Sequence, residues 1–156
     1  MYHNVLVPLD GSPLAECVLP HVETVAKGCG VKNVTFIRVV PLADLSTTGG
    51  AYVFSDEERK RMEAANKFAA EEYLKQLTSR VKYGGVTVKS EVIIATRAAD
   101  IPDIIVEYAA KKKVDLIIIA THGRSGISHA IWGRVAGQIL RTSHLPVLMV
   151  RPEVCG

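Results

Sequence analysis

Five short runs rich in Val, Ile and Leu recur along this chain of 156 residues, and their spacing leaves few folds open. Runs of this length predict β-strands, and their nearly continuous apolar content indicates strands buried on both faces, as in parallel sheets. None of them reaches the roughly 18 residues that a membrane-spanning helix needs. The predicted strands are Asn4–Leu9, Asn33–Val40, Val86–Ile94, Asp115–Ala120 and Leu145–Val150.

The segments between these runs carry the patterns of amphipathic helices. Ser12 and Pro13 are typical of the cap and the first turn of a helix. That helix is expected to end near Gly28 and to kink at Pro20, where proline removes a backbone hydrogen bond. A capping box that begins at Ser55 predicts a long second helix. Its expected buried stripe is Met62, Ala65, Ala69, Tyr73 and Leu77.

Two further helices complete an alternation of strand and helix. Asp100 is expected to cap the third helix, and the fourth is expected to run from near Gly133 to about Ser143. Strands that alternate with helices form a parallel sheet covered on both faces. We therefore expect an α/β fold with an open five-stranded parallel sheet in the order 3-2-1-4-5. Ligands of such sheets bind where the strand order reverses, here between the loops Leu9–Ser12 and Ala120–Gly133.

A glycine-bearing segment follows the fourth predicted strand. Gly123, Gly126 and Gly133 allow the backbone to approach a phosphate closely and to expose successive N–H groups. The spacing matches neither the P-loop nor the dinucleotide-binding fingerprint. Taken alone, the segment is equally compatible with glycines that serve only a turn from strand to helix.

Three segments together resemble the universal stress protein family. They are V-L-V-P-L-D-G-S at residues 5–12, A-T-H-G-R-S-G at 120–126 and L-P-V-L-M-V-R-P at 145–152. The resemblance extends over essentially the whole chain. It implies one domain, residues 1–152, with a Rossmann-like fold akin to the adenine nucleotide alpha hydrolases, followed by a tail, residues 153–156.

Members of that family that bind ATP carry a motif of glycines that ends in Ser or Thr. Its middle and last glycines fall on Gly123 and Gly133, which nine residues separate. Its first glycine falls on Ala120, and its Ser or Thr falls on Arg134. The resemblance thus implies an adenine nucleotide, ATP or AMP, with or without Mg²⁺.

The residues that the resemblance places at the nucleotide fall into three groups. Adenine and ribose would be bordered by Pro8, Leu9, Asp10 and Val39. The ribose and phosphates would be wrapped by Ala120, Thr121, His122, Gly123, Arg124, Ser125 and Gly126. Backbone N–H groups at a helix start, which favour an anion, would come from Gly133, Arg134, Val135 and Ala136.

Three of these residues have alternative interpretations. Arg134 either contacts a phosphate through its guanidinium group, or fills the phosphate pocket and pairs with Asp10. Asp10 either orients a Mg²⁺ shell or a ribose hydroxyl, or closes an Asx-turn that ends at Ser12. His122 is interpreted as a turn residue rather than a general base, because no partner for a proton relay lies near it in the sequence.

Charge and cysteine patterns argue against several other functions. The net charge of +3 is scattered, which argues against a nucleic-acid partner. The three cysteines, Cys17, Cys29 and Cys155, lack the spacing of a metal site, and we expect them to be free thiols in the cytoplasm. No segment indicates a signal peptide or a membrane partner. No nucleophile and base form a recognisable pair, so we expect at most slow ATP hydrolysis.

The sequence therefore predicts a cytoplasmic, nucleotide-binding regulatory protein of the stress response. The alternative is a dimeric interaction module of the same fold that binds no nucleotide, which the residues at positions 120 and 134 favour. An apolar edge strand tends to pair with a strand of another chain, because its outer backbone groups are unpaired. The resemblance implies a homodimer. Its interface is expected at Pro146, Val147, Leu148, Met149 and Val150.

Overall fold

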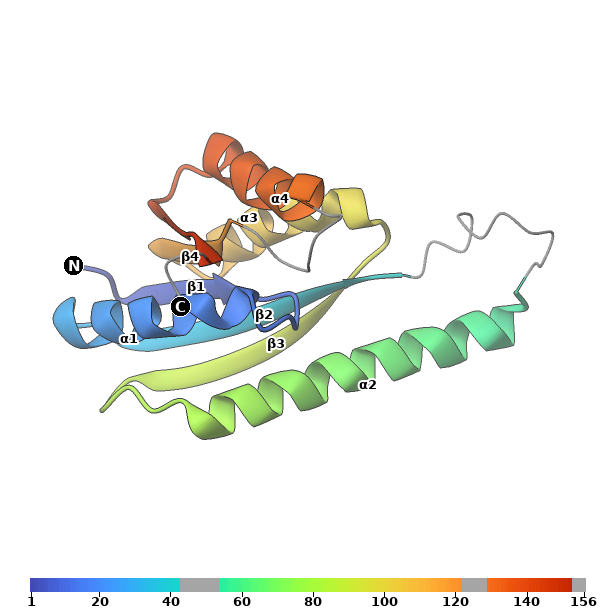
Figure 1. Ribbon diagram of the computed structural model, residues 1–156, viewed down its shortest axis with the longest axis horizontal. Helices are drawn as coiled ribbons and strands as arrows, with labels where there is room; N and C mark the ends of the chain where they lie inside the picture. Colours follow the sequence, from blue (N-terminus) through green and yellow to red (C-terminus); the bar gives the residue numbers. More distant parts are fainter. Residues whose placement is uncertain (43–53, 122–128, 153–156) are drawn as a thin grey trace.

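The computed structural model describes residues 1–42, 54–121 and 129–152. Its strands are β1 (Asn4–Pro8), β2 (Asn33–Pro41), β3 (Thr87–Ala95), β4 (Leu116–Ala120) and β5 (Val147–Val150). They form one parallel sheet in the order β3-β2-β1-β4-β5 (Figure 1). This confirms the predicted fold class and strand order.

Four α-helices in the described part of the chain cover the two faces of the sheet. They are α1 (Leu19–Gly28), α2 (Asp56–Arg80), α3 (Ile101–Lys111) and α4 (His129–Thr142), and the short 3-10 helices η1 (Ala15–Val18) and η3 (Ala98–Asp100) precede α1 and α3. No helix within the described ranges is both long and apolar enough to cross a membrane.

Two apolar clusters, one on each face of the sheet, form the core. Val5 and Val7 pack toward α1 and α2, whereas Leu6 between them packs toward α3 and α4. Successive side chains of a strand point to opposite faces, so a strand covered on both faces must be apolar at every position. The layered arrangement in Figure 1 thus accounts for the unbroken apolar runs of the sequence.

The capping box at the start of α2 is confirmed, but the predicted buried stripe is partly wrong. The Ser55 side chain accepts a hydrogen bond from the Glu58 amide, and the Glu58 carboxylate accepts one from the Ser55 amide. Ala65 and Ala69 are exposed. The buried residues of the helix are Ala70, Leu74 and Leu77. In Figure 1 the start of α2 extends past the ends of β2 and β3, so no described strand lies against the residues there.

Pro20 does not kink a helix, contrary to prediction. It lies in the first turn of α1, which begins at Leu19 after the 3-10 helix. Proline fits that turn because the amides of a first turn have no acceptor within the helix. Ser12 caps an earlier turn, where its Oγ accepts a hydrogen bond from the Ala15 amide at 3.2 Å.

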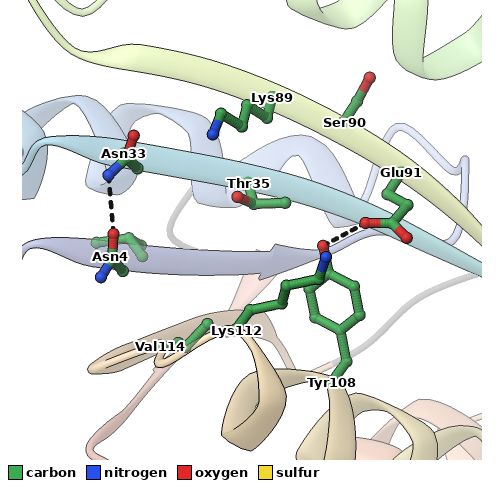
Figure 2. Close-up of a pocket in the computed structure, with 10 residues that line it drawn as sticks. Asn4, Asn33, Thr35, Lys89, Ser90, Glu91, Tyr108, Lys112 and Val114 are labelled. Atoms are coloured by element: carbon green, nitrogen blue, oxygen red, sulfur yellow. Dashed lines mark hydrogen bonds between the residues drawn. The ribbon is translucent and has the colours of Figure 1, made fainter.

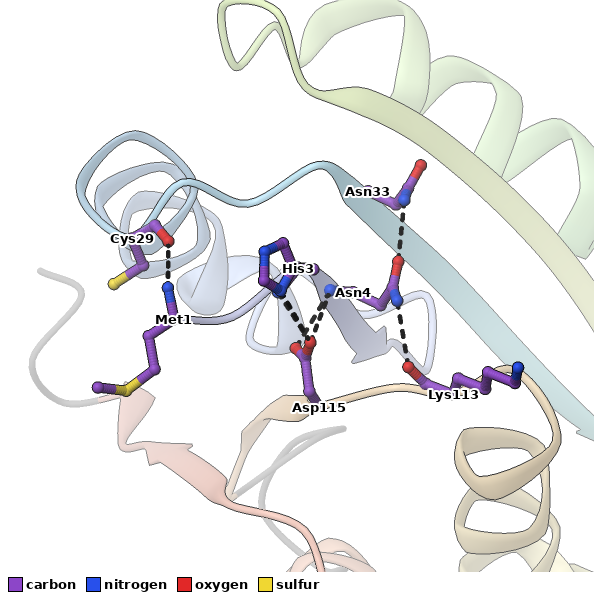
Figure 3. Close-up of polar contacts among 7 residues, drawn as sticks. All are labelled: Met1, His3, Asn4, Cys29, Asn33, Lys113 and Asp115. Atoms are coloured by element: carbon purple, nitrogen blue, oxygen red, sulfur yellow. Dashed lines mark hydrogen bonds and ion pairs between the residues drawn. The ribbon is translucent and has the colours of Figure 1, made fainter.

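The carboxylate of Asp115 has a structural role for which no prediction was made, and that of Asp100 does not form the predicted helix cap. Asp115 precedes β4 and fixes the start of β1, because its carboxylate accepts the amides of His3 (2.8 Å) and Asn4 (3.1 and 3.2 Å; Figure 3). Asp100 holds the cap position of α3 but bonds to the Arg97 guanidinium at 2.7 Å and makes no side-chain cap bond.

Tyr83, in the segment between α2 and β3, gives the fold a testable response to alkaline pH. Its side chain is 4% exposed, and its hydroxyl has no hydrogen-bond partner within the described part of the chain. Burial, followed by the charge of Glu23, raises the pKa of Tyr83 to about 12. The unfolded chain therefore loses this proton first, and stability declines as the pH rises from about 10 to about 12.

We expect Tyr83→Phe to be neutral or slightly stabilising at neutral pH, because it removes a buried hydroxyl without a partner. The variant should also lose less stability than the wild type between about pH 10 and about pH 12. Urea unfolding at a series of pH values measures both effects. An equal alkaline loss in the two proteins contradicts this explanation.

Candidate functional site

The carboxyl ends of β1 and β4 meet at the point where the strand order reverses. β1 pairs with β2 on one side and with β4 on the other. Beyond β1, the Leu9 amide donates to the Ile37 carbonyl of β2 at 2.8 Å. Beyond β4, the Thr121 amide donates to the Val150 carbonyl of β5 at 2.8 Å. Past their ends, the two strands thus bond to different neighbours, β2 and β5, on either side of the point where the strand order reverses. Ligands of parallel sheets bind in the crevice at such a point.

The loop after β1 is an Asx-turn, as one interpretation of Asp10 predicted. Asp10 Oδ1 accepts hydrogen bonds from the Ser12 amide at 2.8 Å and the Ser12 hydroxyl at 2.6 Å. Gly11, between them, has a φ of +83°, in the left-handed region that favours glycine. The carboxylate thereby holds the loop in one shape at the edge of the expected crevice.

Arg38 of β2 supports this loop from the α1–α2 side, a role that the sequence analysis missed. A Cβ built on Gly11 would lie 2.8 Å from the Arg38 guanidinium carbon. The same guanidinium lies 5.5 Å from the centre of the Tyr73 ring, in cation–π range. The signal that marked this position is a charged residue inside an otherwise apolar strand run.

Tyr73 of α2, whose ring lies near the Arg38 guanidinium, also bonds to η1. Its hydroxyl donates to Glu16 at 3.1 Å, and Glu16 also pairs with Arg80. Burial, and then the neighbouring Glu16 carboxylate, raise the pKa of Tyr73 above its ordinary value. The hydroxyl therefore stays protonated as a donor, and the loop after β1 is joined through Arg38 to the long helix.

The predicted adenine and ribose neighbours in the described ranges are buried or half-buried. Pro8 and Leu9 are buried, and Leu9 packs in the α1–α2 cluster. Val39 is half-buried and packs against the α3–α4 cluster. Ala120 is 2% exposed and also belongs to the α1–α2 cluster, so its methyl group fills the core. Thr121 is half-buried at the end of β4.

The predicted helix start at Gly133 is wrong. Helix α4 begins at His129, so Gly133 lies more than one turn inside it. In an α-helix the free amides belong to the first turn, and later amides bond to the carbonyl four residues before them. Val135 and Ala136 are buried in the α3–α4 cluster. The predicted residues His122, Gly123, Arg124, Ser125 and Gly126 lie outside the described residues.

Arg134 is exposed and borders a hollow of about 240 Å³ between the start of α3 and α4. Ala98, Ala99 and Pro102 line its opposite wall. Both interpretations of Arg134, a phosphate contact or a pair with Asp10, therefore stay predictions. Gln138, one turn along, donates to Asp103 at 3.1 Å and joins α4 to α3.

No three His, Cys, Asp or Glu side chains among the described residues gather closely enough to hold a metal ion. Cys17 is buried and Cys29 is half-buried, whereas Cys155 lies outside the described residues.

Sequence comparisons identify the relatives of this chain. A family model described as the universal stress protein family matches residues 1–151. A universal stress protein of Methanocaldococcus jannaschii is 28% identical over 97% of this chain and 83% of its own. The universal stress protein YxiE of Bacillus subtilis is 30% identical over 97% of this chain and 100% of its own.

Solved structures share the fold. A second protein of M. jannaschii, 23% identical, superposes with a TM-score of 0.77 over 97% of this chain and 96% of that one. An Arabidopsis thaliana family member with AMP bound, 13% identical, has a TM-score of 0.58 over 96% and 91% of the two chains. The Archaeoglobus fulgidus protein in complex with dAMP, 20% identical, has a TM-score of 0.54 over 95% and 97%.

Proposed function

The chain belongs to the universal stress protein family, and on that premise we propose that it is a regulatory protein that binds an adenine nucleotide. The observation that carries the proposal is the meeting of the carboxyl ends of β1 and β4 at the reversal of strand order. Relatives of the same fold bind AMP and dAMP, which supports an adenine nucleotide, AMP or ATP, as the ligand.

The residues at this edge of the sheet have the chemical properties that an adenine nucleotide requires. Val39 offers a half-buried apolar surface for adenine, and the Asx-turn at Asp10 gives a shaped wall beside the ribose. Arg134 offers an exposed guanidinium that can hold a phosphate through two parallel hydrogen bonds. The first-turn amides of α4, rather than those of residues 133–136, would face the phosphates.

Mg²⁺, where it accompanies ATP, would be held mainly by the phosphates, because Mg²⁺ commonly uses only one or two carboxylates in nucleotide sites. Asp10 supplies a carboxylate at this edge. We propose signalling through occupancy, with at most slow hydrolysis of ATP, in the cytoplasm.

Calorimetric titration with AMP, ADP, ATP and cyclic AMP, with GTP as the control, tests nucleotide binding. The proposal predicts saturable binding of at least one adenine nucleotide and weaker binding of GTP. Failure of every adenine nucleotide to bind at millimolar concentration would contradict it. That result would favour the alternative, a dimeric interaction module of the same fold without a nucleotide.

Replacing Arg134 tests the phosphate contact. Arg134→Ala is expected to weaken ATP binding by about tenfold, the loss of one charge-assisted contact, and AMP binding by less. Arg61→Ala, which removes an exposed arginine from the far half of α2, is the matched control and should leave the affinity unchanged. If Arg134→Ala binds ATP as tightly as the wild type, the contact role is wrong.

We also propose a homodimer in which β5 pairs with its counterpart. β5 is an edge strand of the sheet, and Met149 on it is 38% exposed. An apolar, unpaired edge is a site of strand addition. Met149→Lys should shift the sedimentation coefficient from dimer to monomer. Leu140→Lys, which changes an exposed leucine on α4, should not. A dimer that survives Met149→Lys places the interface elsewhere.

A further inference from the structure

A polar groove of about 460 Å³ lies at the end of the sheet opposite the expected nucleotide crevice. It occupies the α3–α4 face at the amino ends of β1, β2 and β3, beside the end of α3 (Figure 2). Its volume falls within the range of about 300–1,000 Å³ that is typical of small-molecule sites.

The strand register explains why polar groups gather there. Asn4 pairs with Asn33, and Thr35 pairs with Lys89, so these residues are neighbours across three adjacent strands. They share a face with Ile37, which is buried in the α3–α4 cluster, because alternate residues of a strand point the same way. Faces of parallel sheets are ordinarily apolar and covered. Here the covered apolar surface gives way to an open polar one on two central strands.

Hydrogen bonds hold the walls of the groove in place. The Tyr108 hydroxyl of α3 donates to the Glu91 carboxylate of β3 at 2.6 Å. Burial, and then this hydrogen bond, raise the pKa of Tyr108 above its ordinary value, so the donor keeps its proton. On the floor, the Asn33 amide group donates to Asn4 at 2.8 Å, and the Asn4 amide group donates to the Lys113 carbonyl at 3.2 Å (Figure 3). The groove is therefore preorganised.

Two ammonium groups border the groove against a single carboxylate among its lining residues, Glu91. Lys89 extends from β3, and Lys112, just past the end of α3, lies 5.5 Å from the Tyr108 ring centre. Neither lysine forms an ion pair with a described residue, whereas the adjacent Lys111 pairs with Glu107 at 2.7 Å. Lys112 also complements the negative end of the α3 dipole, but that role does not account for Lys89 on the sheet.

We propose that this groove binds a sugar phosphate, with the phosphate between Lys89 and Lys112. The hydroxyl groups of the sugar would then meet the amide of Asn33, the hydroxyl of Thr35 and the free carboxylate oxygen of Glu91. The combination of cations with both donors and acceptors matches a ligand that carries an anion and several hydroxyls. The site is separate from the nucleotide crevice and goes beyond the proposed function.

Amide chemical-shift mapping on isotope-labelled protein tests this site with three probes: glucose phosphate, inorganic phosphate and glucose. Glucose phosphate is expected to give saturable shifts at residues 33–35, 89–91 and 108–114 and to bind at least several-fold more tightly than either other probe. Shifts confined to the carboxyl ends of β1 and β4, or no saturation at millimolar concentration, would overturn the proposal. Equal affinity for glucose phosphate and inorganic phosphate would overturn the sugar contacts.

Removing the two positive charges that border the groove is the second test of the site. The double variant Lys89→Ala/Lys112→Ala is expected to weaken glucose phosphate binding by about tenfold or more. Lys60→Ala/Lys75→Ala, which removes two exposed lysines from α2, is the matched control for net charge and should bind like the wild type. AMP affinity should be the same in all three proteins. Unchanged glucose phosphate binding in the first variant would overturn the assignment.

Discussion

Replacing Phe36 with alanine is expected to lower the free energy of unfolding by about 3–5 kcal/mol. Phe36 lies on β2, is completely buried and packs in the α1–α2 cluster. The loss combines the transfer of a large aromatic side chain with the cavity that it leaves, because packed interiors collapse only partly around a deletion. Urea denaturation followed by circular dichroism measures the difference.

Phe68→Ala is the matched control, since it makes the same chemical change at a side chain of α2 that is 65% exposed. We expect its effect to stay within about 0.5 kcal/mol, as for most surface substitutions. Comparable losses in the two variants would show that the first half of α2 is covered in solution, and that the layering described above is incomplete.

Gly11→Ala is expected to lower the free energy of unfolding by about 1–3 kcal/mol and to weaken adenine nucleotide binding. Alanine is strained at the φ of +83° found there, and its Cβ would lie 2.8 Å from the Arg38 guanidinium. Arg38 would have to leave its place over the Tyr73 ring, which loosens the loop that borders the crevice. Denaturation and calorimetric titration of one preparation measure both effects.

Two other glycines separate backbone strain from the contact with Arg38. Gly30 has a φ of +67° with open space around it, so Gly30→Ala should show the strain without a loss of nucleotide affinity. Gly28, at the end of α1, has neither feature, and Gly28→Ala should be neutral or stabilise by up to about 1 kcal/mol. If Gly11→Ala and Gly30→Ala behave alike in both assays, Arg38 does not support the loop.

Strands β1 and β4 were predictable because both faces of each are covered along most of its length. Leu116–Ala120 is buried at every position, so its sequence has to be an unbroken apolar run, and such runs are visible without a structure. The capping box at Ser55 was visible for a similar reason, since it depends only on residues three apart.

Helix boundaries and the buried faces of helices were not predictable where they depend on distant parts of the chain. Ala69 satisfies helical spacing as well as Ala70 does, and the position of the sheet beneath α2 decides which of them is buried. Gly133 is a poor helix former, yet α4 continues through it, because tertiary packing overrides local propensity. Pro20 was predicted to kink the first helix, and its place in the first turn became visible only with the start of α1 at Leu19.

The candidate site was predictable in place but not in detail. The switch point follows from strand order, and the Asx-turn at Asp10 follows from local chemistry. The approach of Arg38 to Gly11 was not predictable, because it joins β2 to the loop after β1, and the two become neighbours only in the folded sheet. The polar groove was not predictable for the same reason, because its residues become neighbours only through the register of three strands.

A crystal structure of the protein grown with saturating AMP decides where the nucleotide binds. The expected result is AMP beyond the carboxyl ends of β1 and β4, with adenine near Val39 and the phosphate toward the start of α4. AMP bound at the amino ends of the strands, or an empty crevice under saturating ligand, would contradict the nucleotide site proposed for this chain.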